Sequence, residues 1–500
     1  MKKLFATLLT LVMLLSLCTG CMVMMPERKV VKPDLKEEQK NSDTLLSEEE
    51  IAYVMIYNPE IYDEEDSYNE LLTTGDFSDY VEAVISRADG LGGPASELRT
   101  LSVDEINEGV DLSGFDLSGG RGGAFIVPYQ TGDTHEFYCG TTNREKQLFE
   151  CKYAGEYCNI WSYDNQISES DAMQMANEFD SNIYNQMVSM FGEPRFADNG
   201  GKVNILFYPM EHGYGGFFIN ADLFASDEVT PSQITQYGIN TDHAIININS
   251  DMLELNLDYA KSTLAHEFQH LICFTNYFET IQYTMMKTWL NEAMSGYVEE
   301  QLYPGAKDIS GHFESFVSSN RIRHGQSMYN FETTTTNSEW DIGVYGSVYL
   351  FSEYLAALAG DDVFLEIHSY WRNSGSDTLS EAEAIKNSVA ASVYDDIDGL
   401  LDYENAITFG SAEEEWMSKL VLDFYLSLLQ PNSSAPKNYD KIEAQTLLYD
   451  EINAADIEGG GRVIVALKNG EFQFPTDADN GLVYIGLDKD FNIVTDFVVR

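Results

Sequence analysis

Hydrophobic positions follow a helical period in some stretches of this chain and a strand period in others. After residue 168, apolar side chains recur every three or four residues until Gly192 and Pro194 interrupt the pattern. A helix over 168–190 is therefore predicted, and Ser168 with Asp171 forms a capping pair at its start.

Strands are predicted on both sides of this helix. Short apolar runs are separated there by glycine, asparagine and aspartate, which are typical turn residues. The strand patterns are residues 124–127, 136–138, 158–162, 203–208 and 244–249, further helical patterns lie at 341–359 and 412–430, and two last strand patterns lie at 462–467 and 482–487.

These elements predict an α+β protein, and 500 residues are enough for two or three domains. The expected parts are a signal peptide (1–20), a disordered tether (21–50), a β-rich N-terminal module (51–165), a central domain (166–445) and a small C-terminal β module (446–500).

The central domain contains the sequence His-Glu-Phe-Gln-His at 266–270. Side chains four residues apart lie on one face of a helix, so His266 and His270 can bind one metal ion. Glu267 is rotated by roughly 100° from His266, which suits a base that reaches a water beside the ion. The apolar residues around the motif predict a buried helix.

A second segment supplies a third ligand. Apolar residues over 289–298 recur at helical spacing and leave Glu292 on another face. Burying a carboxylate without a partner is costly, and a cation removes that cost. Two imidazoles and one carboxylate are the ligand set of a hydrolytic zinc site with one open position. His266, His270 and Glu292 are therefore the predicted zinc ligands, and Glu267 is the predicted catalytic base.

With these residues, the chain resembles the gluzincins, the thermolysin-like zinc peptidases whose third ligand is a glutamate. Residues 264–272 and 288–292 are most similar to hyicolysin-type bacterial metallopeptidases, and the resemblance covers about residues 120–430. It implies a zincin-like catalytic domain over 166–445, with a small mixed sheet, the motif helix and a mainly helical C-terminal part.

The resemblance also implies a mechanism, in which Glu267 deprotonates a zinc-bound water that then attacks a peptide bond of a protein or peptide substrate. Such peptidases place a sheet edge beside the metal, where an extended peptide can add as a strand. We expect 244–249 or the segment 215–218 at that edge; the alternative is that these strands belong only to the core. The candidates for stabilising the oxyanion are Tyr345, which is favoured, Tyr297 and His324.

One position departs from the thermolysin-like pattern. Those enzymes carry an aspartate four residues after the third ligand, where it orients an imidazole, and here that position is Gly296. Outer carboxylates of this kind strengthen metal binding. Glu299 is a candidate substitute two helical turns beyond Glu292, and the alternative is an ordinary solvated glutamate.

The N-terminus predicts export. Lys2 and Lys3 precede an apolar run over 4–17, which is too short to span a bilayer and has the layout of a signal peptide. The run ends in a sequence that resembles a bacterial lipobox cleaved before Cys21, which would carry the lipid that anchors the chain to the cell membrane or cell surface. Ordinary secretion is the alternative.

Three further cysteines, Cys139, Cys151 and Cys158, lie within 20 residues of one another. An oxidising exterior would permit one disulfide among them, and we expect Cys151–Cys158 or Cys139–Cys151.

The charge of the chain limits its partners. There are 82 acidic and 29 basic residues, and the formal net charge is −53. Such a surface repels nucleic acid and anionic lipid, so membrane contact is expected through the lipid anchor alone. Calcium is a second candidate cation, because it takes carboxylate oxygens, and a monomer is expected.

These observations favour an extracytoplasmic, lipid-anchored zinc endopeptidase. The alternative is a non-catalytic, adhesin-like surface lipoprotein that retains a zincin fold. Loss of the base would indicate the second, and Glu267 is present.

Overall fold

The computed structural model describes most of the chain from residue 129 onwards and part of what precedes it. The described residues are 45, 50–61, 68–70, 129–140, 144–194, 201–210, 215–223, 226, 230–255, 257–277, 286–306, 312–330, 343–360, 362–374, 380–401, 409–429, 446–448, 456–467, 472, 474, 481–495 and 497–499. The expected signal peptide, Cys21, nearly all of the tether and the strand pattern 124–127 lie outside them.

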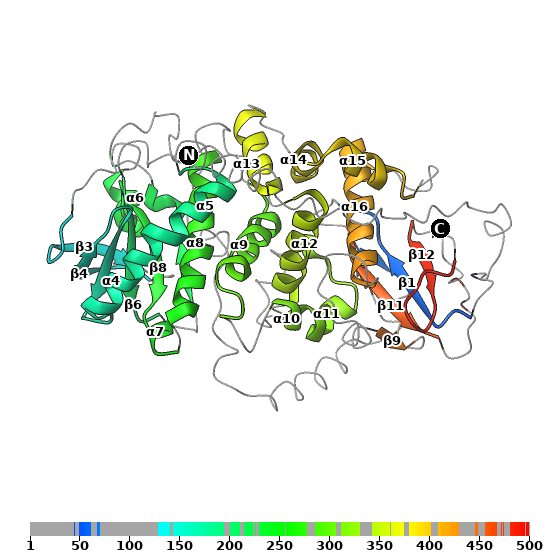
Figure 1. Cartoon of the computed structure of the whole chain (residues 1–500), viewed down its shortest axis with the longest axis horizontal. Helices are drawn as coiled ribbons and strands as arrows, with labels where there is room; N and C mark the ends of the chain where they lie inside the picture. The colour runs from blue at the N-terminus through cyan, green and yellow to red at the C-terminus, as the bar shows by residue number, and fades with distance from the viewer. Residues whose placement is uncertain are drawn as a thin grey trace, which may run out of the picture. The chain divides into compact units, whose positions relative to one another are not determined.

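The described strands belong to three sheets (Figure 1). They are β1 (Tyr53–Tyr57), β2 (Tyr68–Glu70), β3 (Thr134–Cys139), β4 (Glu145–Ala154), β5 (Cys158–Tyr163), β6 (Val203–Tyr208), β7 (Gly216–Phe218), β8 (Ala244–Asn249), β9 (Thr446–Leu448), β10 (Asp456–Glu458), β11 (Arg462–Ala466), β12 (Val483–Leu487) and β13 (Val498–Val499).

The helices fill most of the chain between β5 and β9. They are α4 (Glu169–Glu178), the π-helical turn η4 (Phe179–Ile183), α5 (Tyr184–Phe191), the 3-10 turn η7 (Asn220–Leu223), α6 (Pro231–Tyr237), α7 (Met252–Leu255), α8 (Leu257–Tyr277), α9 (Thr288–Leu302), α10 (His312–Ser318), α11 (Asn320–Arg323), η8 (Met328–Asn330), α12 (Gly343–Ala359), α13 (Val363–Ser374), α14 (Glu381–Ser388), α15 (Ala391–Asp398) and α16 (Ala412–Leu429). The architecture is a mixture of α and β structure, as expected, and no described helix is long and apolar enough to cross a membrane.

A mixed six-stranded sheet has the order β3-β4-β5-β6-β8-β7. Strands β5, β6 and β8 run parallel to one another, and the outer strands are antiparallel to their neighbours. The sheet crosses the domain boundary that was expected at residue 165, because β5 before this boundary pairs along its length with β6 after it. A strand pattern shows which face is buried but does not show which strand is the partner.

The second large sheet also crosses an expected boundary. Its order is β13-β12-β1-β11-β9, so β1 lies between two strands from the C-terminal part of the chain. The strand patterns at 462–467 and 482–487 are confirmed as β11 and β12, but their module needs β1 to complete it. The Tyr57 hydroxyl on β1 donates to the Ser418 carbonyl at 2.9 Å, which joins this sheet to α16.

The helical prediction at 168–190 is confirmed over α4, η4 and α5. Ser168 caps the start, since its side chain accepts from the backbone N–H of Asp171 at 3.1 Å. The π-helical turn places the Phe179 ring 4.9 Å from the Phe268 ring, in the middle of the 266–270 motif. This helical segment therefore packs directly against the predicted metal-binding helix.

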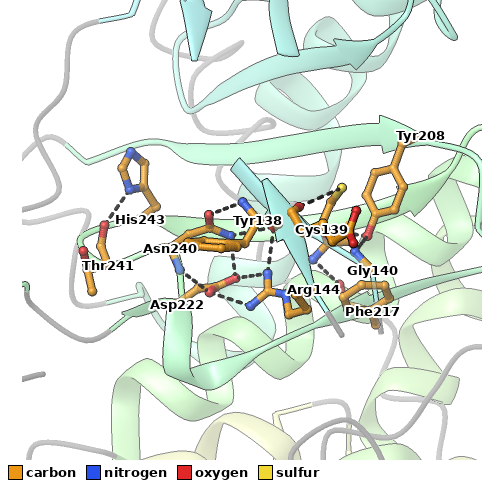
Figure 2. A network of polar contacts seen from close by, with 12 residues as sticks. Tyr138, Cys139, Gly140, Arg144, Tyr208, Phe217, Asp222, Asn240, Thr241 and His243 are labelled. Carbon is orange, nitrogen blue, oxygen red and sulfur yellow. Dashed lines mark hydrogen bonds and ion pairs between the residues drawn. The ribbon is translucent and has the colours of Figure 1, made fainter. Parts of the chain in front are cut away.

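A buried polar network holds the β3–β4 hairpin against the segment that follows β7 (Figure 2). Both guanidinium NH groups of Arg144 donate to the Asp222 carboxylate at 2.9 Å. One of them also donates to the Tyr138 carbonyl at 3.0 Å. The Asn240 backbone N–H donates to Asp222 at 2.8 Å.

A second branch of this network reaches β7 itself (Figure 2). The Gly140 N–H donates to the Tyr208 hydroxyl at 3.1 Å, and that hydroxyl donates to the Asn247 side chain at 3.1 Å. The Asn247 amide in turn donates to the Phe217 carbonyl at 3.3 Å. The short strand β7 is thus held by side chains as well as by its ladder with β8.

The predicted disulfide is wrong, since Cys139, Cys151 and Cys158 are all free thiols. Cys151 pairs with Trp161, which is three residues from Cys158 on β5, so the two cysteines face opposite sides of the sheet. Cys139 pairs with Glu145. Cys151 lies six residues farther along β4, about 20 Å away, whereas a disulfide needs Cα atoms within about 7 Å.

Candidate metal centre

The helix α8 carries both motif histidines and the predicted base. His266, Glu267 and His270 are at most 1% exposed, so the motif lies in the interior as its apolar neighbours predicted. The Phe274 ring, one turn after His270, packs 6.0 Å from the Phe218 ring of β7. The helix α8 therefore lies between the six-stranded sheet and α9 (Figure 1).

The structure brings the three predicted ligands together. The ligand atoms of His266, His270 and Glu292 lie within 4.8 Å of one another, and among the described residues this is the one such cluster of three. The His266 Nε2 atom is 3.2 Å from Glu292 Oε2, and the His270 Nε2 atom is 3.5 Å from Glu292 Oε1. Glu292 is 1% exposed and comes from α9, which packs along α8.

These separations fit a bound zinc ion. Ligand atoms about 2.0–2.1 Å from a tetrahedral zinc are about 3.3 Å apart. The chemistry of the cluster agrees, because buried imidazole and carboxylate groups need a cation or other polar partners. Within the described part of the chain, no hydrogen bond reaches His270 Nε2 or Glu292 Oε1.

Glu299, the candidate substitute for an outer carboxylate, contacts His266. It follows Glu292 by two helical turns on α9, and its Oε1 atom lies 2.8 Å from His266 Nδ1. The two ring nitrogens of His266 therefore face two different carboxylates. The alternative of a solvated glutamate is wrong, since Glu299 is 1% exposed.

Sequence reasoning missed His312. This residue begins α10, and its Nε2 atom lies 2.8 Å from Glu299 Oε2. No motif or spacing connects it to the metal-binding segments, because it reaches Glu299 only through the packing of α10 against α12 and of α12 against α9.

Burial and charge set different pKa values for the two histidine ligands. Burial lowers the pKa of His270 to about 4, which keeps this ring neutral, as a metal ligand must be. Burial also acts to lower the pKa of His266, but the Glu299 and Glu292 carboxylates outweigh it and raise that pKa to about 10. The negative charge that favours a proton at His266 also favours a metal cation.

Strand β7 is one of the two edge strands of the six-stranded sheet, β3 being the other, while β8 (Ala244–Asn249) is an interior strand. Of the two expected edge segments, 215–218 therefore forms the edge. The Asn249 N–H donates to the Gly215 carbonyl at 2.9 Å. Because hydrogen-bonded positions alternate in an antiparallel pair, Gly216 and Phe218 direct their backbone groups away from β8.

This edge lies against the motif helix. A Cβ atom on Gly216 would be 2.9 Å from the Thr263 methyl group on α8, so the close approach requires glycine. Thr263 lies one helical turn before Glu267. An extended chain along β7 would consequently run beside the base.

The three candidates for the oxyanion donor have different surroundings. Tyr297 is about 140° around α9 from Glu292, and its ring packs 4.8 Å from Phe364. The Nδ1 atom of His324 lies 2.6 Å from the Asn320 carbonyl in its own helical turn. Tyr345 is partly buried near the start of α12. All three side chains therefore have partners, and Tyr345 stays the preferred candidate from its residue type and position in the sequence alone.

Comparison with known proteins identifies a sequence relative and, among solved structures, a distant match. No family model matches the chain. A 260-residue stretch is 29% identical to the neutral metalloprotease ShpI of Staphylococcus hyicus and covers 50% of this chain and 55% of that protein. The chain thus spans about half the length of this relative. A structure of yeast LTA4 hydrolase in complex with bestatin has 13% identity and a TM-score of 0.30, over 62% of this chain and 56% of that one. Half of this chain is therefore similar to a metalloprotease, and the chain contains a buried His-His-Glu cluster that can hold a metal ion.

Proposed function

We propose that this chain is a zinc endopeptidase, in which His266, His270 and Glu292 bind the ion and Glu267 is the general base. The observation that carries the proposal is the buried cluster of three ligands whose spacing suits tetrahedral zinc. The sequence similarity to a neutral metalloprotease supports it.

A zinc ion at this site would supply Lewis-acid chemistry, lowering the pKa of a water molecule towards neutrality and polarising a peptide carbonyl. Glu267 follows His266 on α8, roughly 100° around the helix from it, and is fully buried. It accepts the proton of the attacking water and passes that proton to the leaving amine. Tyr345 is the proposed donor to the developing oxyanion.

The substrate is an extended segment of a protein. Edge strand β7 directs the backbone groups of Gly216 and Phe218 away from β8. The strand is buried, so a substrate segment would have to displace what covers it before it could add there as a further strand. Main-chain hydrogen bonds at this edge bind a peptide in its middle and do not require a free terminus. This supports cleavage of internal peptide bonds.

The proposal also includes export and lipid attachment at Cys21, for which the support is the N-terminal sequence pattern. Labelled palmitate should enter the unmodified chain and should not enter Cys21→Ser. Label that survives this substitution would contradict attachment at Cys21. A monomer without a nucleic-acid partner is proposed from the net charge of −53, and calcium binding stays a prediction.

Substitution of the base tests the catalytic proposal. In Glu267→Gln the side chain keeps its size but cannot accept a proton, so the chain should still bind about one zinc while cleavage of an unfolded protein falls by a factor of about 10²–10⁴. Glu300→Gln is the matched control, because this carboxylate on α9 accepts the Gly305 N–H at 3.3 Å and should not affect the rate. A normal cleavage rate in Glu267→Gln would remove Glu267 from the mechanism.

A further inference from the structure

One carboxylate near the metal centre lies between two imidazole rings. The Oε1 atom of Glu299 is 2.8 Å from His266 Nδ1, and its Oε2 atom is 2.8 Å from His312 Nε2. The side chains of Glu299 and His312 are only 2% and 10% exposed. The three residues come from α9, α8 and α10, so the arrangement is made by tertiary packing.

We propose that His312 is a positioning residue for the metal centre. It holds the Glu299 carboxylate, which in turn holds the His266 ring so that Nε2 faces the ion. This inference rests on the proposed function, because His266 is a proposed zinc ligand.

Hydrogen-bond chemistry explains how His312 can act on His266 through Glu299. An ionised carboxylate can only accept, so each imidazole binds Glu299 by a hydrogen bond only when the nitrogen that faces the carboxylate carries a proton. A proton on His266 Nδ1 leaves the lone pair of a neutral ring on Nε2, the atom 3.2 Å from Glu292. Removal of the His312 donor would take away the contact that holds Oε2 of Glu299, and with it part of the support for Oε1 beside His266.

The packing around His312 agrees with this role. Its ring lies 4.9 Å from the Tyr349 ring on α12, and a Cβ atom on Gly296 would be 3.8 Å from its Nε2 atom. A larger side chain at position 296 would therefore extend into the space of the imidazole. The glycine that departs from the thermolysin-like pattern is the residue that leaves room for His312.

Metal affinity provides the test. The full chain is stripped of metal, and its zinc affinity is measured by competition with a chromophoric chelator. His312→Phe keeps a ring against Tyr349 but removes the donor, so it should weaken zinc binding about tenfold, and Glu299→Ala should weaken it about 10–100-fold. His312→Gln restores an N–H donor and should recover part of the affinity.

A second readout separates positioning from folding. The visible absorption spectrum of bound Co²⁺ depends on ligand geometry, so it should shift in His312→Phe and Glu299→Ala while circular dichroism stays unchanged. Glu300→Gln is the control and should match the unmodified chain in both measurements. If His312→Phe does not fold, His312→Ala, which also lacks the donor, and the near-isosteric Glu299→Gln provide the same comparison.

The outcomes distinguish the two proposals. If the unmodified chain binds no zinc, both the proposed function and this inference are overturned. If it binds zinc and a folded His312 variant without the donor has the same affinity and the same cobalt spectrum, the inference alone is overturned. An equal loss of affinity in Glu300→Gln would also overturn it, because the effect would then not depend on contact with Glu299.

Discussion

The close packing of α10 on α12 depends on one glycine. A Cβ atom on Gly346 would meet the His312 carbonyl oxygen and would lie 2.6 Å from Phe316 N and 2.8 Å from Phe316 Cβ. Carbon atoms in favourable contact are about 3.5–4.0 Å apart. Gly346→Ala should therefore push the first turn of α10 away from α12 by about 1 Å.

The cost can be estimated from this geometry. Overpacking that forces a backbone shift costs about 1–3 kcal/mol, and the nearest atoms here belong to backbone, which places this substitution in the upper part of that range. Alanine gains about 1 kcal/mol over glycine within a helix. The net expectation is a loss of about 1–2 kcal/mol in the free energy of unfolding.

Gly296→Ala is the matched control. This glycine is also within a helix, but its Cβ atom would lie 3.5 Å from Tyr349 Cβ and 3.8 Å from the His312 ring, which are ordinary contacts. The control should be as stable as the unmodified chain or up to about 1 kcal/mol more stable. Urea unfolding of all three proteins, followed by circular dichroism, measures the difference, and zinc affinity should fall only in Gly346→Ala because it displaces His312. Equal stability of the two alanine variants would refute the packing argument.

Three further predictions concern residues that are not zinc ligands. Asp222→Asn should destabilise the chain by about 3–5 kcal/mol, because it leaves the buried Arg144 guanidinium without its carboxylate. Lys489→Ala is the control: it removes an exposed ion pair and should not change the urea midpoint. An equal midpoint for Asp222→Asn and the unmodified chain would contradict this prediction. Burial lowers the pKa of His368 to about 3, so as the pH falls below 6.5 the unfolded state binds a proton that the folded state does not, and stability present at neutral pH is lost. At pH 5.5 this loss is about 1.4 kcal/mol. The free energy of unfolding should therefore fall more steeply between pH 7.5 and 5.5 in the unmodified chain than in His368→Gln. Parallel curves would show that His368 does not contribute to the pH dependence of stability. Phe268→Ala removes the ring that packs on Phe179 and should cost about 3–5 kcal/mol in urea unfolding; a loss below 1 kcal/mol would mean that the π-helical turn does not support α8.

Local sequence patterns predicted the elements of the metal centre well. The spacing of His266 and His270 and the inward face of Glu292 depend on helical geometry alone, so they could be inferred without knowledge of the tertiary fold. The capping pair at Ser168 and the role of Glu299 as a candidate substitute followed from the same geometry. These are relations within one helix, where sequence distance fixes spatial distance.

Relations between distant segments were not predictable. Strand β1 has the same apolar pattern as many strands, and only its pairing with β11 and β12 places it in the C-terminal sheet. His312 could not be assigned because a single histidine has no periodicity. The disulfide prediction used sequence proximity, whereas the pleat of β5 places Cys151 and Cys158 on opposite faces.

The central claim is that peptide hydrolysis takes place at one zinc ion bound by His266, His270 and Glu292. The most direct measurement is the cleavage rate of an unfolded protein while zinc is added stepwise to the metal-free chain. The rate should rise in proportion to zinc and become constant at about one ion per chain, as expected for a single three-ligand site. A chain that binds zinc at this ratio and cleaves nothing, or one that cleaves fully without metal, would contradict it.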